Sequence, residues 1–307
     1  MPERVIILGA SGMLGAMLAD RLARDTGLAV TATVRNEALA QKGRRQLPEA
    51  TWALFDAGAP HFEAGLKAVS EHDWVINAIG ITKPLVHDDN AAEVERAIGI
   101  NSLLPFLLAE QAKTSGTRIL QIATDCVYSG RQGAYRESDP HDPLDVYGKT
   151  KSLGEVPAEH VRHLRCSIIG PEPKDRKFLL EWFLGQEPGG GVNGFTNHRW
   201  NGVTTLAFAR LCKTIIKNDI ALPRVLHVIP GDDVSKHELL QIFAGAYGRA
   251  DINITPMAAP KIVDRTLETE HEDTNRTLWA AAEYESPPSV AQMVEEMAGY
   301  QRQLVEM

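Results

Sequence analysis

The sequence predicts an α/β protein with a doubly wound parallel sheet and a smaller C-terminal lobe. Through the first 170 residues, short apolar runs alternate with segments of helical periodicity. This alternation is typical of parallel strands joined by helices that cover both faces of a sheet. The first apolar run leads into a glycine-rich turn, Gly9 to Gly15, and then into a helical pattern. After residue 170 prolines and glycines gather, which indicates loops and a second lobe.

The elements of the sheet domain are expected in strict order. Arg4 to Leu8 is a short apolar run that fits a fully buried parallel strand. Pro105 is expected to kink a long helix, because proline has no backbone N–H to donate. Strands are expected near 4–8, 28–34, 51–55, 73–77, 117–123 and 162–168, and helices near 12–25, 61–70, 91–115 and 144–160.

The chain divides into a nucleotide-binding domain and a substrate lobe. Residues 1–170 form the first, and a helix over 202–217 is expected to return to it, so that 201–225 belong to the same domain. The lobe consists of residues 171–200 and 226–307, with short helices in its last stretch.

The turn after the first strand is a candidate cofactor site. Its glycines follow the spacing G-x-x-G-x-x-G, which differs from the more common G-x-G-x-x-G. Glycines in a strand-to-helix turn let the backbone approach a pyrophosphate, which then lies at the positive end of the helix. The residues expected to bind the cofactor here are Gly9, Ser11, Gly12, Met13, Leu14 and Gly15.

The residues at the ends of the next strands indicate which cofactor is used. The strand 28–34 ends in Arg35, where a chain that prefers NAD carries an acidic residue for the ribose 2′-hydroxyl. A guanidinium suits a 2′-phosphate, so NADP(H) is predicted over NAD(H), with a solvated surface arginine as the alternative. Asp56 is placed to meet the adenine, and Ala78 and Gly80 lie where the rest of the cofactor should run.

The most informative catalytic pattern is Tyr147-x-x-x-Lys151, with Thr124 upstream. Residues four apart on a helix project from the same face. A nearby ammonium lowers the phenol pKa from its free value of about 10, so that the tyrosine can exchange a proton with a substrate oxygen. An isolated match of this kind is more often an exposed helix face, but here the cofactor motif accompanies it.

Composition excludes several classes of function. With 32 basic and 40 acidic residues the net charge is −8, which argues against nucleic acid or a membrane surface as a partner. Apolar runs fall short of the roughly 18 residues of a membrane span, and a first strand at residue 4 leaves no room for a signal peptide. Three widely spaced cysteines, without metal-ligand spacing, are expected to be reduced cytoplasmic thiols, and no metal site is expected.

Taken together, the motifs resemble the extended short-chain dehydrogenase/reductase superfamily, and within it dTDP-4-dehydrorhamnose reductase and related NDP-sugar reductases. The resemblance is strong to about residue 170 and weak afterwards. The segments that carry it are Gly9 to Gly15, Thr124 to Tyr128, Tyr135-x-Glu137-x-Asp139, Pro143, and Tyr147 to Glu155. It implies a Rossmann fold of the extended type and a nucleotide-sugar substrate, and it leaves a homodimer open.

The resemblance also implies roles for single residues. Tyr147 would protonate the sugar carbonyl oxygen, Lys151 would bind the nicotinamide ribose, and Thr124 would hydrogen bond to the same carbonyl. Asn101 matches a superfamily asparagine whose role is taken as structural. Asp125 and Cys126 lie at the substrate; Trp200 would pack on a ring and Arg199 would meet a phosphate, with surface or core roles as the alternative for these last two.

One departure from the family pattern bears on the reaction. Dehydratases of the superfamily have a glutamate after Asp125, whereas this chain has Cys126, whose thiol is no equivalent base. Dehydration is therefore not expected. Reductases more often have an aromatic residue at this position, so the sequence leaves the identity of the sugar open.

The leading hypothesis is an NADPH-dependent reductase of a nucleotide-linked 4-keto sugar. The alternatives are an epimerase or epimerase–reductase, with His141 or Cys126 as the extra acid–base group, and a non-catalytic dinucleotide-binding regulatory subunit.

Overall fold

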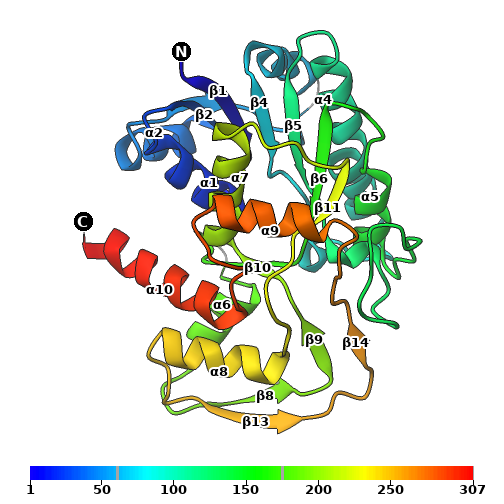
Figure 1. Ribbon diagram of the computed structural model, residues 1–307, viewed down its shortest axis with the longest axis vertical. Helices are drawn as coiled ribbons and strands as arrows, with labels where there is room; N and C mark the ends of the chain where they lie inside the picture. The colour runs from blue at the N-terminus through cyan, green and yellow to red at the C-terminus, as the bar shows by residue number, and fades with distance from the viewer. Residues whose placement is uncertain (60–61, 174–175, 307) are drawn as a thin grey trace.

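A parallel sheet lies at the centre of the computed structural model, which describes residues 1–59, 62–173 and 176–306. Within that range the sheet has seven strands in the order β11-β6-β5-β4-β1-β2-β3, and every pair is parallel (Figure 1). The chain winds outward from β1 to β3 and then crosses back to β4, which confirms the predicted doubly wound fold. The strands are β1 (Glu3–Leu8), β2 (Leu28–Val34), β3 (Thr51–Leu54), β4 (Trp74–Asn77), β5 (Arg118–Ile122), β6 (Val161–Arg165) and β11 (Val225–His227).

Helices cover both faces of the sheet because successive side chains of a strand point to opposite sides. In β1, Val5 and Ile7 join the apolar cluster beneath α1 (Met13–Ala23), α2 (Glu37–Gln46) and α7 (Thr205–Lys217). Ile6 and Leu8 join the cluster on the other face, beneath η1 (Phe62–Glu71) and α4 (Leu104–Ala112). Figure 1 shows α5 (Val146–Leu153) on the same side as α4.

The expected helix 91–115 is divided into three parts. α3 (Ala91–Ala97) is followed by a π-helical turn, η3 (Ile98–Leu103), and then by α4. Pro105 explains the division in part, because it cannot donate to the carbonyl of Asn101 and so interrupts the α-helical ladder. The expected kink therefore takes the form of a π turn.

Other elements also differ from the expectation. α2 and β11 were not predicted, and the segment 61–70 forms a 3-10 helix over Phe62–Glu71, with residue 61 outside the described residues. α5 ends at Leu153 instead of near residue 160. At the next residue, Gly154, a Cβ atom would lie 2.0 Å from the carbonyl oxygen of Asn101, and Pro157 follows shortly after.

The C-terminal lobe is built from small sheets, the helix α8 (Lys236–Ala246) that packs on β8 and β13, and further helices. β8 pairs with β13, β9 pairs with β12 and β14, and β7 pairs with β10 at the junction to the large sheet. These elements are β7 (Ile168–Ile169), α6 (Leu179–Leu184), β8 (Gly191–Phe195), β9 (His198–Trp200), β10 (Val203–Thr204), β12 (Val234–Ser235), β13 (Asn253–Met257), β14 (Val263–Asp264), α9 (Glu272–Ala281) and α10 (Val290–Glu306).

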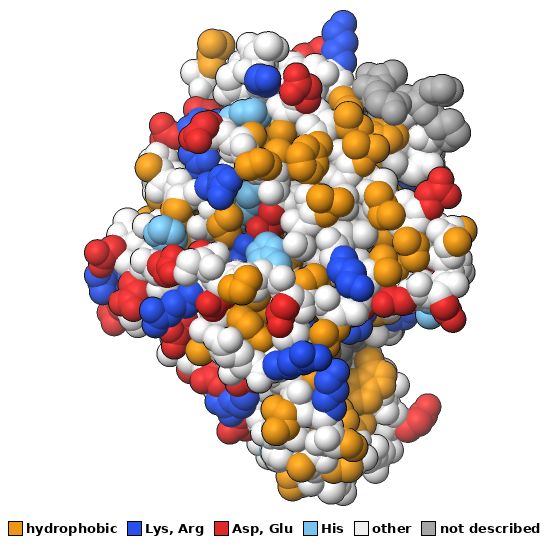
Figure 2. Space-filling model, turned by 90° about the vertical axis from the view of Figure 1, so that its right-hand side faces the viewer, with side chains coloured by type: hydrophobic (Ala, Val, Ile, Leu, Met, Phe, Trp, Pro, Cys, Tyr) orange, Lys and Arg blue, Asp and Glu red, His pale blue; other side chains and the backbone are white. Residues whose placement is uncertain are grey.

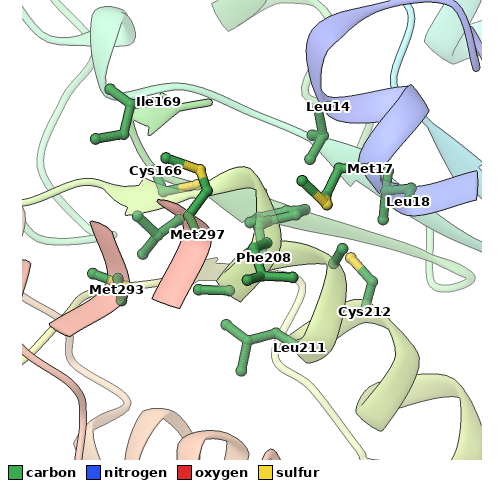
Figure 3. Close-up of a cluster of buried hydrophobic side chains, with 14 of the residues drawn as sticks. Leu14, Met17, Leu18, Cys166, Ile169, Phe208, Leu211, Cys212, Met293 and Met297 are labelled. Carbon is green, nitrogen blue, oxygen red and sulfur yellow. The ribbon is translucent and has the colours of Figure 1, made fainter. Parts of the chain in front are cut away.

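The last helix packs onto the nucleotide-binding side of the molecule. Figure 3 shows Met293 and Met297 of α10 in one apolar cluster with Leu14 and Met17 of α1 and with side chains of α7. The boundary between the two expected domains is thus bridged by apolar packing, and their division at residues 170 and 226 stays a proposal. Among the described residues, no helix is long and apolar enough to cross a membrane.

Candidate functional site

The three predicted catalytic side chains come together at the carboxyl end of β5. Thr124 follows this strand and caps the short 3-10 helix η4 (Asp125–Val127), accepting a hydrogen bond from the Cys126 amide at 3.2 Å. The Thr124 hydroxyl also faces the phenol of Tyr147 on α5 and acts on its pKa. Lys151, one turn further along α5, donates from Nζ to the carbonyl of Ile122 at 2.7 Å.

Close backbone contacts hold α5 against this strand end. A Cβ atom at Gly148 would lie 2.3 Å from the Cys126 carbonyl oxygen, so only glycine allows this approach. On the other side Asn101 accepts from the Ile81 amide at 2.8 Å and donates to the Thr150 hydroxyl at 3.2 Å. Asn101 thus ties the loop after β4 to α5, which is the structural role expected of it.

Burial dominates the titration of the catalytic pair. It raises the pKa of Tyr147 well above its ordinary value, and the nearby Cys126 acts in the same direction, while the Thr124 hydrogen bond opposes them. Burial lowers the pKa of Lys151 to about 8, against the attraction of Glu155. The expectation that the ammonium lowers the Tyr147 pKa is therefore contradicted, because Lys151 is not among the main influences on that pKa. A phenol that stays protonated is the form required of a proton donor.

The glycine-rich turn has the geometry that a diphosphate needs. Gly9 has a φ of +88°, a conformation that favours glycine. A Cβ atom at Gly15 would lie 2.1 Å from the Gly9 carbonyl oxygen, so the turn packs directly on the first turn of α1. Gly12 caps α1 without a side-chain hydrogen bond, which leaves the N–H groups of the first turn for an anion. Ser11 and Met13 are half-buried beside it, and Leu14 is buried.

The other predicted cofactor residues lie at the same edge of the sheet. Arg35 is exposed directly after β2, and Asp56 follows β3 and accepts from the Gly58 amide at 3.0 Å. Ala78 donates its amide to Leu8 at 3.1 Å, after β4, and Gly80 lies beside the Asn101 side chain. Because β1 and β4 are neighbours from opposite halves of the sheet, this edge is the topological switch point, where ligands of such folds bind.

Only two of the four predicted substrate residues lie beside Tyr147. Asp125 and Cys126 lie beside Tyr147, and burial raises the pKa of both, that of Cys126 to about 12. Arg199 is instead paired with Asp233 and, at 3.5 Å, with Glu238. Trp200 is buried and donates from its indole to the Ser167 hydroxyl at 2.8 Å. The alternative surface and core roles thus describe the contacts of Arg199 and Trp200 better than ligand contacts do.

Two cationic residues near Asp125 had no signal in the sequence. Lys236 begins α8, and Arg265 follows β14, so both come from the C-terminal lobe. Their charges act on Asp125, and the charge of Arg265 also acts on Cys126. No spacing rule links residues this far apart, so the fold alone could reveal them.

A buried polar network lies beneath the site. Arg165 forms two hydrogen bonds to the carboxylate of Glu155, at 3.0 and 2.6 Å, and a third to the Tyr128 hydroxyl at 2.6 Å. His141 belongs to this network, since its two ring nitrogens contact the Ser152 hydroxyl at 2.7 Å and Arg165 at 2.9 Å. Burial lowers the pKa of His141. Both nitrogens are engaged, so His141 is placed as a structural residue and not as a free acid or base.

The comparison with known proteins agrees with the family resemblance seen in the sequence. The family described as RmlD substrate binding domain matches residues 3–171. A dTDP-4-dehydrorhamnose reductase of Streptomyces griseus is 36% identical over 155 residues, which are 50% of this chain and 43% of that protein. The methionine adenosyltransferase 2 subunit beta of Danio rerio is 27% identical over 175 residues, 53% of each chain. The chain thus spans about half the length of the curated relatives it matches.

Solved structures extend the likeness of fold to nearly the whole chain. The dTDP-4-dehydrorhamnose reductase of Bacillus anthracis, solved in complex with NADP, has a TM-score of 0.70 and 18% identity, covering 97% of this chain and 99% of that one. At such identity the likeness concerns the fold, which is the one described above.

Proposed function

Because this chain belongs to the RmlD substrate binding domain family, we propose that it reduces the 4-keto group of a nucleotide-linked deoxysugar to an alcohol. The observation that carries the proposal is the meeting of Thr124, Tyr147 and Lys151 at the carboxyl end of β5. A sugar carbonyl placed against Thr124 and Tyr147 receives two hydroxyl hydrogen bonds once the Thr124 hydroxyl turns away from the Asp125 carboxylate, to which it donates in this structure. These bonds strengthen as negative charge develops on the oxygen, and Tyr147 then gives up its proton.

The glycine turn and the edge at β1 and β4 fit a dinucleotide. When bound, NADPH supplies the hydride that this reduction consumes. The uncapped first turn of α1 holds the diphosphate, and Arg35 lies at the end of β2, where the adenosine ribose of such a cofactor is placed. Lys151, whose Nζ donates to the Ile122 carbonyl beside the site, would orient the nicotinamide ribose. The preference for NADPH over NADH rests on Arg35.

Removing Arg35 should change the cofactor preference. In the Arg35→Ala variant we expect NADPH binding to weaken by about 1–3 kcal/mol, the value of a charge-assisted contact, and NADH binding to stay nearly unchanged. Fluorescence titration of both cofactors measures this difference. Arg24→Ala, at the far end of α1 where Arg24 pairs with Asp20, is the matched control. Equal losses for both cofactors would mean that Arg35 does not read the 2′-phosphate.

The environments of the two candidate acid–base residues argue against the epimerase alternative. An epimerase that moves a proton at carbon needs an additional acid–base residue, and His141 and Cys126 are the candidates for it. His141 is engaged at both ring nitrogens. The pKa of Cys126 is raised to about 12, mainly by burial, so its thiol stays protonated near neutral pH. Neither group supports epimerisation or dehydration.

One assay separates the remaining functions. NADPH oxidation should be followed with dTDP-, UDP-, GDP- and CDP-linked 4-keto sugars, with the products identified by mass spectrometry. The reductase proposal expects oxidation with at least one of them and, in a separate incubation without NADPH, no loss of water from an NDP-hexose. If NADPH binds tightly and no keto-sugar is reduced, the protein is better explained as a non-catalytic dinucleotide-binding subunit; one of its relatives is named as the beta subunit of methionine adenosyltransferase 2.

We also propose that two copies of the chain associate through the face formed by η3, α4 and α5. Figure 2 views this side of the molecule and shows hydrophobic side chains gathered on it. Five of the eleven large apolar side chains exposed in the described part of the chain lie here, each at least 40% exposed: Ile98, Leu103, Phe106, Leu144 and Leu153. Exposed charges of both signs accompany them, namely Glu95, Arg96, Glu110 and Lys149. A face with apolar residues and both charges suits a second copy of itself.

Charged substitutions on this face should separate the two copies. We expect the double variant Leu103→Glu, Phe106→Glu to convert a dimer into a monomer, because the free-energy cost of burying the new carboxylates would exceed the gain from the apolar contact. Light scattering after size-exclusion chromatography measures the mass. Trp182→Glu, at an equally exposed position on α6, should leave the dimer intact. A wild-type protein that is monomeric at high concentration would contradict the proposal.

A further inference from the structure

Two carboxylates hold the start of α5, the helix that carries Tyr147. Asp145 precedes the helix and accepts a hydrogen bond from the Gly148 amide at 2.9 Å. Asp88, in the loop after β4, accepts from the Val146 amide at 3.1 Å. These two amides lie one residue before and one residue after the proposed proton donor. The first N–H groups of a helix have no partner within the helix, so the carboxylates fix the turn that contains Tyr147.

The Asp145 carboxylate is itself held by a lysine. One of its oxygens accepts from Gly148, and the other pairs with Nζ of Lys83 at 2.6 Å. Lys83 begins η2 (Lys83–Leu85), in the same loop as Asp88. Burial acts to raise the pKa of Asp145, but the hydrogen bonds from Lys83 and from the Gly148 amide outweigh it, so the pKa lies below its ordinary value. The carboxylate is therefore charged near neutral pH, which strengthens both of its hydrogen bonds.

The loop that carries Asp88 is anchored to the protein just before this residue. Val86 is buried in a small apolar cluster, and Val146, the first residue of α5, packs against the same cluster. His87 donates its amide to the carboxylate of Glu93 on α3 at 2.7 Å. Because Val86 and His87 are fixed in this way, Asp88 meets the start of α5 from a defined position.

Other hydrogen bonds that hold α5 lie further along the chain. Asn101 donates to Thr150, and Arg165 donates to Glu155 directly beyond the helix. These contacts fix the second half of α5, so the position of the first turn depends on the two carboxylates. Misplacing a reacting group by about 1 Å can lower a rate by about 10²-fold. The contacts that set the first turn therefore bear directly on turnover.

Resting on the function proposed above, we propose that Asp145 and Asp88 are positioning residues for Tyr147. They act through the backbone of α5, by fixing its first turn so that the phenol and the Thr124 hydroxyl face the same carbonyl oxygen. Neither carboxylate exchanges a proton with the substrate. Each has to supply an acceptor oxygen at a defined place, which an asparagine side chain also offers.

Pairs of variants separate the acceptor from the rest of the side chain. In Asp145→Ala we expect turnover to fall by about 10- to 100-fold, as for a misplaced reacting group. The dissociation constant of NADPH should stay within a few-fold, because the glycine turn lies on another element. Asp145→Asn keeps an acceptor for the Gly148 amide and should keep most of the activity. Asp88→Ala and Asp88→Asn should show the same contrast in stopped-flow NADPH oxidation.

A matched control removes a helix cap outside the proposed site. Ser289 precedes α10 and accepts from the Gln292 amide at 3.1 Å. Ser289→Ala and Asp145→Ala should lower the melting temperature by similar amounts, but only Asp145→Ala should lose turnover. Equal turnover in these two variants would overturn the proposal. An Asp145→Asn enzyme as slow as Asp145→Ala would also contradict it, because the carboxylate itself would then be required.

A spectroscopic measurement keeps the test independent of the reductase function. With tyrosines labelled with ¹³C at Cζ, the resonance of Tyr147 is identified by its absence in Tyr147→Phe. It should shift in Asp145→Ala and Asp88→Ala and stay near its wild-type position in both asparagine variants, which lose the same charge. No shift in either alanine variant would overturn the positioning role. The predicted shifts in a protein that reduces no keto-sugar would support that role and refute the reductase function alone.

Discussion

Turnover should fall by roughly 10²–10⁴ when Tyr147 is replaced by phenylalanine, the usual size of a general-acid contribution. The ring and its packing remain, and only the acidic hydrogen is lost. Cofactor affinity should therefore stay within a few-fold of the wild-type value. Stopped-flow NADPH oxidation with a competent keto-sugar measures the first quantity, and fluorescence titration of NADPH measures the second.

The other two members of the site should fail in different ways. Lys151→Ala should lose both turnover and NADPH affinity, since the ammonium is proposed to contact the ribose as well as the phenol. Thr124→Ala should lose mainly turnover, but it also removes the acceptor that caps η4. Thr124→Ser keeps a hydroxyl for both roles and should keep most of the activity.

A matched control variant tests whether the loss of turnover is specific to Tyr147. Tyr300→Phe removes a tyrosine hydroxyl on α10 that bonds to Asp20, outside the proposed site, and should leave turnover unchanged. A Tyr147→Phe enzyme that turns over at near wild-type rate would end the proposed mechanism, whatever the family relationship.

The second large effect is expected on stability, at Arg165. This side chain is 1% exposed and forms a two-pronged ion pair with Glu155, which is 10% exposed. Arg165→Met should lower the free energy of unfolding by about 3–5 kcal/mol, because a buried carboxylate is left without its partner. Urea unfolding at neutral pH measures the change. Arg162→Met, on the same strand but partly exposed, should stay within about 0.5 kcal/mol of the wild-type protein.

The effect of Arg165→Met should also depend on pH in a defined direction. In the wild-type protein Arg165 holds the pKa of Glu155 below its ordinary value, so this stabilisation is present above the unfolded pKa of about 4.3 and is lost as the pH falls through the folded pKa. In the variant, burial without a partner raises that pKa. The difference between the two proteins should therefore be largest near pH 7, should narrow as the pH falls through the raised pKa of Glu155 in the variant, and should narrow further as the pH falls from about 4.3 through the lowered folded pKa of the wild-type protein.

A double variant tests the physical reason for the loss. Arg165→Met with Glu155→Leu removes both charges and should recover more than half of the stability lost by the single variant. If the single variant loses less than about 1 kcal/mol, the network does not anchor the base of the site.

Much of the nucleotide-binding domain could be predicted from the sequence because its signals are local. Apolar runs located six strands to within a few residues, and glycine spacing located the turn before α1. The spacing of Tyr147 and Lys151 placed both on one helix. α2 was missed because most of its residues are polar or charged and its buried face is small, consisting of Ala40 and Gly43. Near Pro105 a kink was expected and a π-helical turn is found, and the helix expected to continue to about residue 160 ends before Gly154.

The sequence by itself determined the fold class, the cofactor turn and the catalytic pair, since each depends on residues that are close in the chain. Only the tertiary structure decided what surrounds them. Trp200 and Arg199 proved to be engaged with protein side chains, and His141 proved to be bound within the Arg165 network. Lys236 and Arg265 reach the site from the C-terminal lobe. Contacts between residues more than a hundred positions apart depend on the path of the chain, and no periodicity or spacing encodes them.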